Sequence, residues 1–92
     1  MKLKYNLQVN EVAGQFIAVA LGEDSKKCKN IIFLNKVGSY ILQLLFEEIT
    51  RNDIITSVLA HYEGNPDVIR SETIEFLDKL KDLGLLSDEQ KT

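Results

Sequence analysis

The first third of the chain has the residue pattern of β-strands. Apolar and polar residues alternate from Leu3 to Asn10, which predicts a strand with one buried face. The apolar, partly β-branched segment Gln15–Leu21 predicts a second strand, and Ile31–Leu34 predicts a third. Short connections favour antiparallel pairing of neighbouring strands. The pattern therefore predicts a small antiparallel sheet, which needs helices to cover its apolar face.

The rest of the chain has the spacing of three amphipathic helices. Asn35 can cap the first helix, and Thr50 can cap the second, which Gly64 can end. Asn65–Pro66 can begin the third helix, and Gly84 can end it. The residues expected on the buried faces are Val37, Ile41, Leu44 and Leu45 in the first helix, Ile54, Ile55, Val58, Leu59 and Tyr62 in the second, and Ile69, Thr73, Phe76, Leu77, Leu80 and Leu83 in the third.

Three strands followed by three helices define the α+β class. The turn between the last two helices is short, as in a helix-turn-helix, and an attached antiparallel sheet is the other component of a winged helix. We therefore predict one winged helix-turn-helix-like domain over residues 1–92, with strands at about 3–34, helices at about 36–83 and a polar tail at 87–92.

Composition and charge narrow the function by exclusion. The chain is 45% hydrophobic, but no apolar run approaches the roughly 18 residues of a membrane span, so we expect no membrane partner. Polar residues interrupt any apolar leader segment, so we expect a cytoplasmic location. The net charge of −3 is divided unevenly. Residues 1–36 hold six basic and three acidic residues, a net +3, whereas residues 37–92 hold five basic and eleven acidic residues, a net −6.

The sequence offers little for catalysis. His61 is the only histidine, and we expect it near the surface at the C-terminal end of the second helix, where it can interact with the helix dipole. Cys28 is the only cysteine and lies in a lysine-rich loop without a partner base or a resolving cysteine. The glycines are not spaced as in a phosphate-binding loop. We therefore expect no catalytic residue, no metal and no cofactor, and hence no enzyme.

A helix-turn-helix pair raises DNA binding as an alternative function, because its second helix usually enters the major groove. Here that helix, residues 66–83, carries five acidic and three basic residues, a net charge of −2. The phosphates of DNA would repel a helix with this negative net charge. We therefore expect no nucleic-acid partner and keep a winged-helix DNA-binding transcription regulator as the alternative.

An extended peptide is another partner that the predicted sheet could bind. An open edge can accept a further strand, with main-chain hydrogen bonds giving affinity and side-chain pockets giving selectivity. Ile31–Leu34 is short and apolar, so it fits such an edge, although it equally fits a buried strand. The neighbouring lysines could steer an acidic peptide. An unpaired edge also makes a homodimer a hypothesis.

Two stretches carry a family resemblance, one around the first predicted helix and one at the end of the third. They are Leu34–Asn35, Gly38, Ile41 and Leu44–Leu45, and then Phe76–Leu77, Leu80 and Leu83–Gly84–Leu85–Leu86. In these residues, and along nearly the whole chain, the sequence resembles the coenzyme PQQ synthesis protein D (PqqD) family, the peptide-recognition domains of ribosomal peptide modification systems.

The resemblance implies that the leader of a precursor peptide docks as an added strand on the third strand, beside the third helix. The domain then presents the peptide to a modifying enzyme, often a radical S-adenosylmethionine (SAM) protein. In the third helix, Ile74 does not lie on the predicted buried face, so it is free to contact a peptide. Leu77 lies on that face, and it fits a position in the core as well as a position in the cleft. The peptide-binding residues that the resemblance implies are Lys29, Asn30, Ile31, Ile32, Phe33, Leu34, Arg70, Ile74, Leu77 and Lys81.

Overall fold

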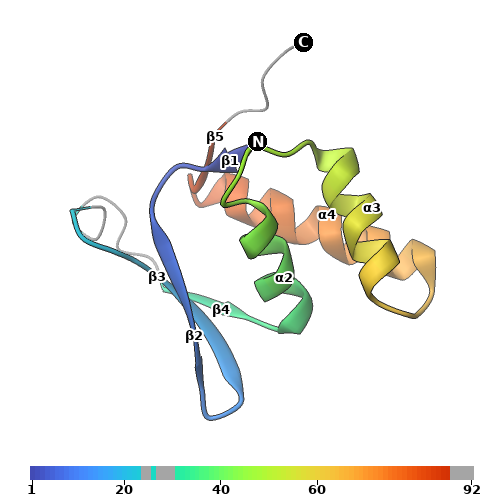
Figure 1. Ribbon diagram of the computed structural model, residues 1–92, viewed down its shortest axis with the longest axis horizontal. Helices are drawn as coiled ribbons and strands as arrows, with labels where there is room; N and C mark the ends of the chain where they lie inside the picture. Colours follow the sequence, from blue (N-terminus) through green and yellow to red (C-terminus); the bar gives the residue numbers. More distant parts are fainter. Residues whose placement is uncertain (24–25, 27–30, 88–92) are drawn as a thin grey trace.

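The computed structural model describes residues 1–23, 26 and 31–87 and has the expected α+β architecture (Figure 1). Strands β2 (Leu7–Val12), β3 (Gln15–Ala20) and β4 (Ile32–Leu34) form an antiparallel sheet in the order β2–β3–β4. Two short strands, β1 (Lys2–Leu3) and β5 (Leu86–Ser87), form a separate antiparallel pair. The predicted order of three antiparallel strands and then three helices is confirmed.

The helices are α2 (Lys36–Leu44), α3 (Arg51–His61) and α4 (Pro66–Asp82). All three begin at the predicted caps, Asn35, Thr50 and Asn65. Each cap side chain accepts a hydrogen bond from a backbone N–H two or three residues further on, at 2.7, 3.1 and 2.9 Å. Over residues 1–23, 26 and 31–87, no helix has both the length and the apolar character needed to cross a bilayer.

The strand predicted over residues 3–10 is divided between two partners. Its first residues belong to β1, which pairs with β5, whereas Leu7–Val12 pairs with β3. Between the two strands, the Lys4 N–H donates to the Leu85 carbonyl at 2.8 Å, which attaches this segment to the end of the helical part. Buried and exposed residues still alternate along it. The prediction was therefore correct about the alternation and wrong about a single continuous strand.

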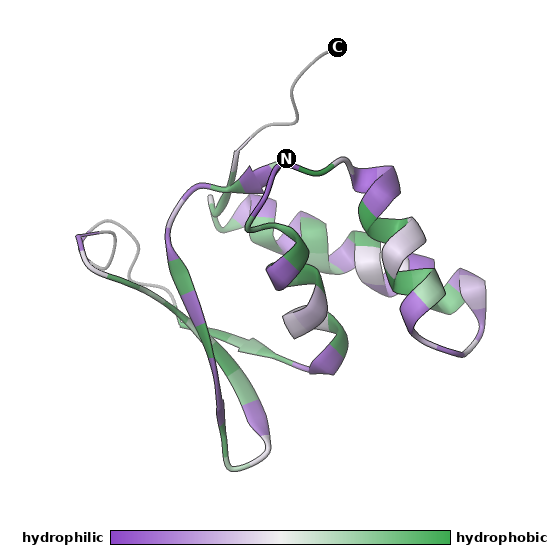
Figure 2. Cartoon of the chain, viewed as in Figure 1, coloured by the Kyte–Doolittle hydropathy of each residue, from purple (hydrophilic) through white to green (hydrophobic). Residues whose placement is uncertain are grey.

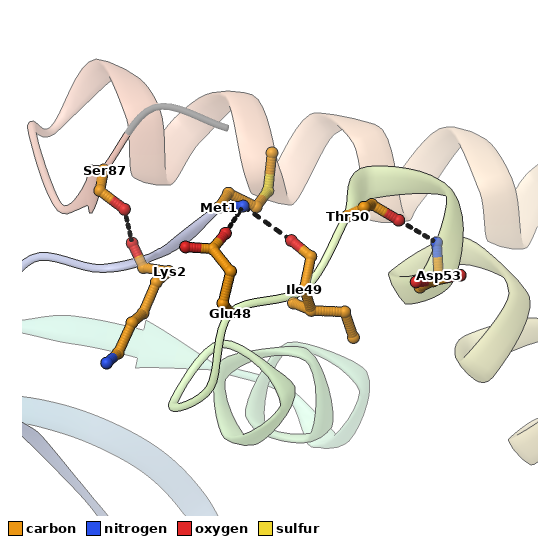
Figure 3. A network of polar contacts seen from close by, with 7 residues as sticks. All are labelled: Met1, Lys2, Glu48, Ile49, Thr50, Asp53 and Ser87. Carbon is orange, nitrogen blue, oxygen red and sulfur yellow. Dashed lines mark hydrogen bonds and ion pairs between the residues drawn. The ribbon is translucent and has the colours of Figure 1, made fainter. Parts of the chain in front are cut away.

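A polar network holds the first residues against the helices (Figure 3). The amino group of Met1 donates to the Glu48 carboxylate and, at 2.7 Å, to the Ile49 carbonyl. The Ile49 N–H donates to the Met1 carbonyl at 3.0 Å. On the other side, the Ser87 hydroxyl donates to the Lys2 carbonyl at 3.0 Å. The beginning of the chain is thus bonded both to the α2–α3 connection and to β5.

One hydrophobic core joins the sheet to all three helices. Thr73 of α4 is a fully buried polar residue, and its hydroxyl donates to the Ile69 carbonyl at 2.8 Å, so this buried group has a partner. The apolar core residues come from the inner face of the sheet (Leu7, Ala18, Ile32, Leu34), from α2 and its C-cap (Ile41, Leu42, Leu45), from α3 (Ile54, Val58), from α4 (Leu77, Leu80) and from the chain ends (Met1, Leu3, Leu85, Leu86).

The orientation of α2 can be tested with two leucines on different sides of the helix. Leu42 is fully buried, whereas Leu44 is only partly buried. We expect Leu42→Ala to lower the free energy of unfolding by about 2–5 kcal/mol, because it leaves a cavity in the core. Leu44→Ala should cost clearly less. Urea denaturation of both variants measures the difference, and equal losses would contradict the orientation of α2.

Candidate functional site

Strand β4 forms one open edge of the sheet. It pairs with β3 on one side, and no other strand of the described residues lies on its second side. Its three residues are all apolar, so it is green over its whole length in Figure 2. Ile32 and Leu34 point into the core, whereas Phe33 is 67% exposed and the preceding Ile31 is 60% exposed. An apolar strand with one exposed row of side chains and one unpaired edge is typical of a peptide-docking surface.

The pairing register shows which backbone groups face the open edge. The Leu21 N–H donates to the Asn6 carbonyl at 2.8 Å, and hydrogen-bonded and non-hydrogen-bonded pairs alternate along an antiparallel ladder. This alternation directs the N–H and C=O of Ile17 towards its β2 partner, Asn10. They are therefore not available to β4, so Ile17 and Phe33 form a non-hydrogen-bonded pair. The N–H and C=O of Phe33 therefore point away from β3, towards the open edge. We call this unpaired side of Ile31–Leu34 the β4 edge.

A narrow cleft lies between the first turn of α2 and the middle of α4. It has a volume of about 60 Å³. Gly38 permits this close approach, because a Cβ atom at this position would lie 3.3 Å from Cε1 of Phe76 and 3.2 Å from Oδ1 of Asn35. The residues that line this α2–α4 cleft are Asn35, Val37, Gly38, Ile41, Glu72 and Phe76. Since Asn35 directly follows β4, the cleft begins where the β4 edge ends.

The two flanks of α4 face different neighbours. Glu72 and Phe76 are four residues apart and share the flank that lines the α2–α4 cleft. Asp78 lies on the other flank, and its carboxylate is 3.4 Å from the guanidinium group of Arg51 in α3. By the same spacing, the residues that share the Asp78 flank are Arg70, Ile74 and Lys81. The structure thus separates these three residues from the cleft beside β4.

The residues predicted for peptide binding fall into four groups. Lys29 and Asn30 lie outside the described residues. Ile31 and Phe33 are exposed on β4 or directly before it. The core contains Ile32, Leu34 and Leu77, whose side chains offer almost no surface to a partner. The Asp78 flank of α4 carries Arg70, which is 3.5 Å from the Asp67 carboxylate, together with Ile74 and Lys81.

Sequence reasoning did not assign Glu72, Phe76 and Val37 to the site. Helical spacing predicts Phe76 on the buried face of α4. Its ring does pack against the core, but it also lines the cleft. The available signal was Gly38 in the first helical turn. A glycine in that turn permits the close approach of another element, but it does not show that this element is the Phe76 flank of α4.

Among the described residues, no group of three or more histidine, cysteine or carboxylate residues could hold a metal ion. His61 lies at the end of α3, as predicted, and is exposed. Its ring stacks on Tyr40 with centroids 4.3 Å apart and contacts Tyr62 edge-on at 4.8 Å. Cys28 lies outside the described residues.

The chain matches the family of coenzyme PQQ synthesis protein D (PqqD) over residues 18–86. It belongs to the PqqD family, and the resemblance found in the sequence is confirmed. No curated protein matches the sequence.

Two solved structures share the fold over almost their whole length. TbiB1, in complex with the TbiA(beta) leader peptide, has a TM-score of 0.69 and 21% sequence identity, and the match covers 99% of this chain and 100% of the TbiB1 chain. Lasso peptide synthetase B1, complexed with the leader peptide, has a TM-score of 0.64 and 16% identity, covering 95% of this chain and 96% of the other. At these identities the matches show a common fold.

The contact between Gly38 and Phe76 predicts a measurable energetic coupling. Gly38→Ala should gain up to about 1 kcal/mol of helix propensity, but the new methyl group meets the Phe76 ring and the capping Asn35 oxygen. We expect the gain to be larger in a Phe76→Ala background, with a coupling of at least about 0.5 kcal/mol. Urea denaturation of the four proteins measures it. Ile74→Ala is the matched control, and an equal coupling there would contradict the assigned flank.

Proposed function

We propose that this protein binds the leader segment of a ribosomally made precursor peptide without catalysing a reaction on it. The leader adds to the β4 edge as a further strand, and its side chains contact Ile31, Phe33 and the α2–α4 cleft. Three observations support the proposal: membership in the PqqD family, a fold shared with two proteins solved with leader peptides, and an apolar strand with one side on which no described strand pairs. We include Lys29 and Asn30 in the docking segment on the sequence argument alone.

The observation that carries the proposal is the outward direction of the Phe33 backbone. A docking strand needs an N–H and a C=O that are not used inside the sheet, and the register of β3 and β4 leaves those of Phe33 for this purpose. The same residue offers a mostly exposed aromatic ring. Backbone bonds and an apolar contact are therefore combined at one position, and this combination suits an extended peptide.

The bound leader would then be presented to a modifying enzyme, and we propose a radical SAM protein as that enzyme. This chain supplies binding and orientation, which raise the effective concentration of the precursor at the enzyme. The genes beside that of this chain provide a direct check, because the proposal expects a short precursor peptide and a radical SAM enzyme there.

The DNA-binding alternative has weaker support. On α4, the acidic residues Asp67, Glu72, Glu75, Asp78 and Asp82 are all exposed, so the helix would present carboxylates to the phosphates. Gel retardation of duplex DNA at low salt tests this alternative. Binding with a steep salt dependence would favour it over the peptide proposal.

Phe33→Pro tests docking on the β4 edge. Proline removes an N–H that the sheet does not use, so the variant should fold and yet bind the leader at least about tenfold more weakly. Glu11→Pro is the matched control, since alternation along β2 also directs the Glu11 N–H to an open edge, but on the opposite side of the sheet. The affinities of both variants are measured by calorimetric titration with the short peptides that are encoded next to the gene of this chain. Unchanged affinity in folded Phe33→Pro would place the leader elsewhere.

The two flanks of α4 can be distinguished with a second matched pair. Phe76 and Ile74 are both partly buried apolar residues of α4, but only Phe76 lines the α2–α4 cleft. We expect Phe76→Ala to weaken leader binding by about tenfold, or about 1.4 kcal/mol, and Ile74→Ala to change it little. The opposite order would assign the contact to the flank of Arg70, Ile74 and Lys81, as the sequence suggested. Circular dichroism checks that both variants are folded.

A further inference from the structure

Within the described residues, the sheet has a second open edge along β2, and a surface hollow borders it. Two adjoining hollows of about 480 and 530 Å³ share Leu7, Leu21 and Phe46 in their lining. They lie between the first half of β2, the segment that precedes it and the C-terminal end of α2. We call the combined surface the β2 groove. Its other lining residues are Lys2, Leu3, Lys4, Tyr5, Asn6, Gln8, Val9 and Gln43.

The β2 groove combines exposed apolar side chains with unpaired backbone. Phe46 is 45% exposed and Leu21 is 43% exposed, although both are large apolar residues beside a well-packed core. No strand of the described residues pairs with the outer side of β2. The alternation set by the Asn6–Leu21 bond directs the N–H and C=O groups of Leu7 and Val9 to that side. An extended segment could therefore add to β2 and place apolar side chains against Phe46 and Leu21.

The charge of the β2 groove indicates the chemistry of its occupant. Among its described lining residues, Lys2 and Lys4 are the charged ones, and both side chains are exposed. Glu47 follows Phe46 but does not line the hollow, and the Glu48 carboxylate is engaged by the Met1 amino group. The described lining of the groove thus offers two cations and no anion, which favours a partner with carboxylates.

We propose that the β2 groove binds an extended segment of a partner protein in which apolar and acidic residues alternate. The apolar side chains contact Leu21 and Phe46, the carboxylates lie near Lys2 and Lys4, and the backbone pairs with Leu7 and Val9. This site is separate from the leader site, because β3 lies between β2 and β4. One chain can therefore hold a peptide on each edge of the sheet. The proposal does not depend on what binds the β4 edge.

A capped heptapeptide of alternating leucine and aspartate residues is a suitable probe. Titrated into the ¹⁵N-labelled protein, it should shift the amide signals of Leu7, Val9 and Leu21 and leave that of Phe33 unchanged. The same peptide with lysine in place of aspartate should bind at least fivefold more weakly. Lys2→Glu and Lys4→Glu should each weaken the aspartate peptide about two- to fivefold. Phe46→Ala should weaken it further, and Lys36→Glu, at an exposed lysine outside the groove, is the matched control.

Several results would overturn the proposal. Shifts confined to the β4 edge, equal binding of the aspartate and lysine peptides, or no shift at millimolar peptide would each exclude the proposed occupant. A second copy of the chain is the competing occupant. If it fills the groove, the β2 signals change with protein concentration in the absence of peptide, and light scattering gives the mass of a dimer. The proposal expects a monomer at the concentrations of the titration.

Discussion

Among the strands of the described residues, β3 pairs with a neighbour on both sides, whereas β2 and β4 each pair on one side only. In a sheet of three strands this difference decides where an extended partner can add, because only the outer strands keep unpaired N–H and C=O groups. The register then selects individual residues, Phe33 on β4 and Leu7 with Val9 on β2. The exposed side chains then differ between the two edges. Those of β4 are apolar, whereas those beside β2 are apolar residues together with Lys2 and Lys4. Both proposed sites follow from this single pattern of pairing.

Helix α2 connects the surroundings of the two edges. Gly38 in its first turn lines the α2–α4 cleft, and Phe46, just after its C-cap, lines the β2 groove. The nine residues of the helix span about 13 Å, and its inner side is held in the core by Ile41 and Leu42. A short helix packed in this way keeps the two surfaces at a constant distance. Occupants of the two edges would therefore keep a defined arrangement relative to each other.

Local signals in the sequence were sufficient for most of the fold. The caps Asn35, Thr50 and Asn65 act on amides within three residues, so the helix starts could be predicted without tertiary information. The division of the first strand could not, because β1 pairs with residues more than eighty positions away. The same limit applies to the site. Helical spacing groups Arg70, Ile74 and Lys81 on one flank of α4, but it does not show which flank faces α2. The place of Phe76 in the cleft therefore emerged only from the packing of α4 against Gly38.

The pairing of β1 with β5 has a consequence for how this fold can be joined to other proteins. Lys2 lies opposite Ser87, so β1 and β5, the first and last strands of the described residues, lie side by side. A unit with adjacent ends can be placed within a surface loop of a larger enzyme without separating the two sides of that loop. The same adjacency would allow a short linker to join the ends and a new opening to be made elsewhere, for example at the exposed Ala13–Gly14 turn between β2 and β3. Either rearrangement would leave the edge of β4 and the packing of α4 against α2 intact.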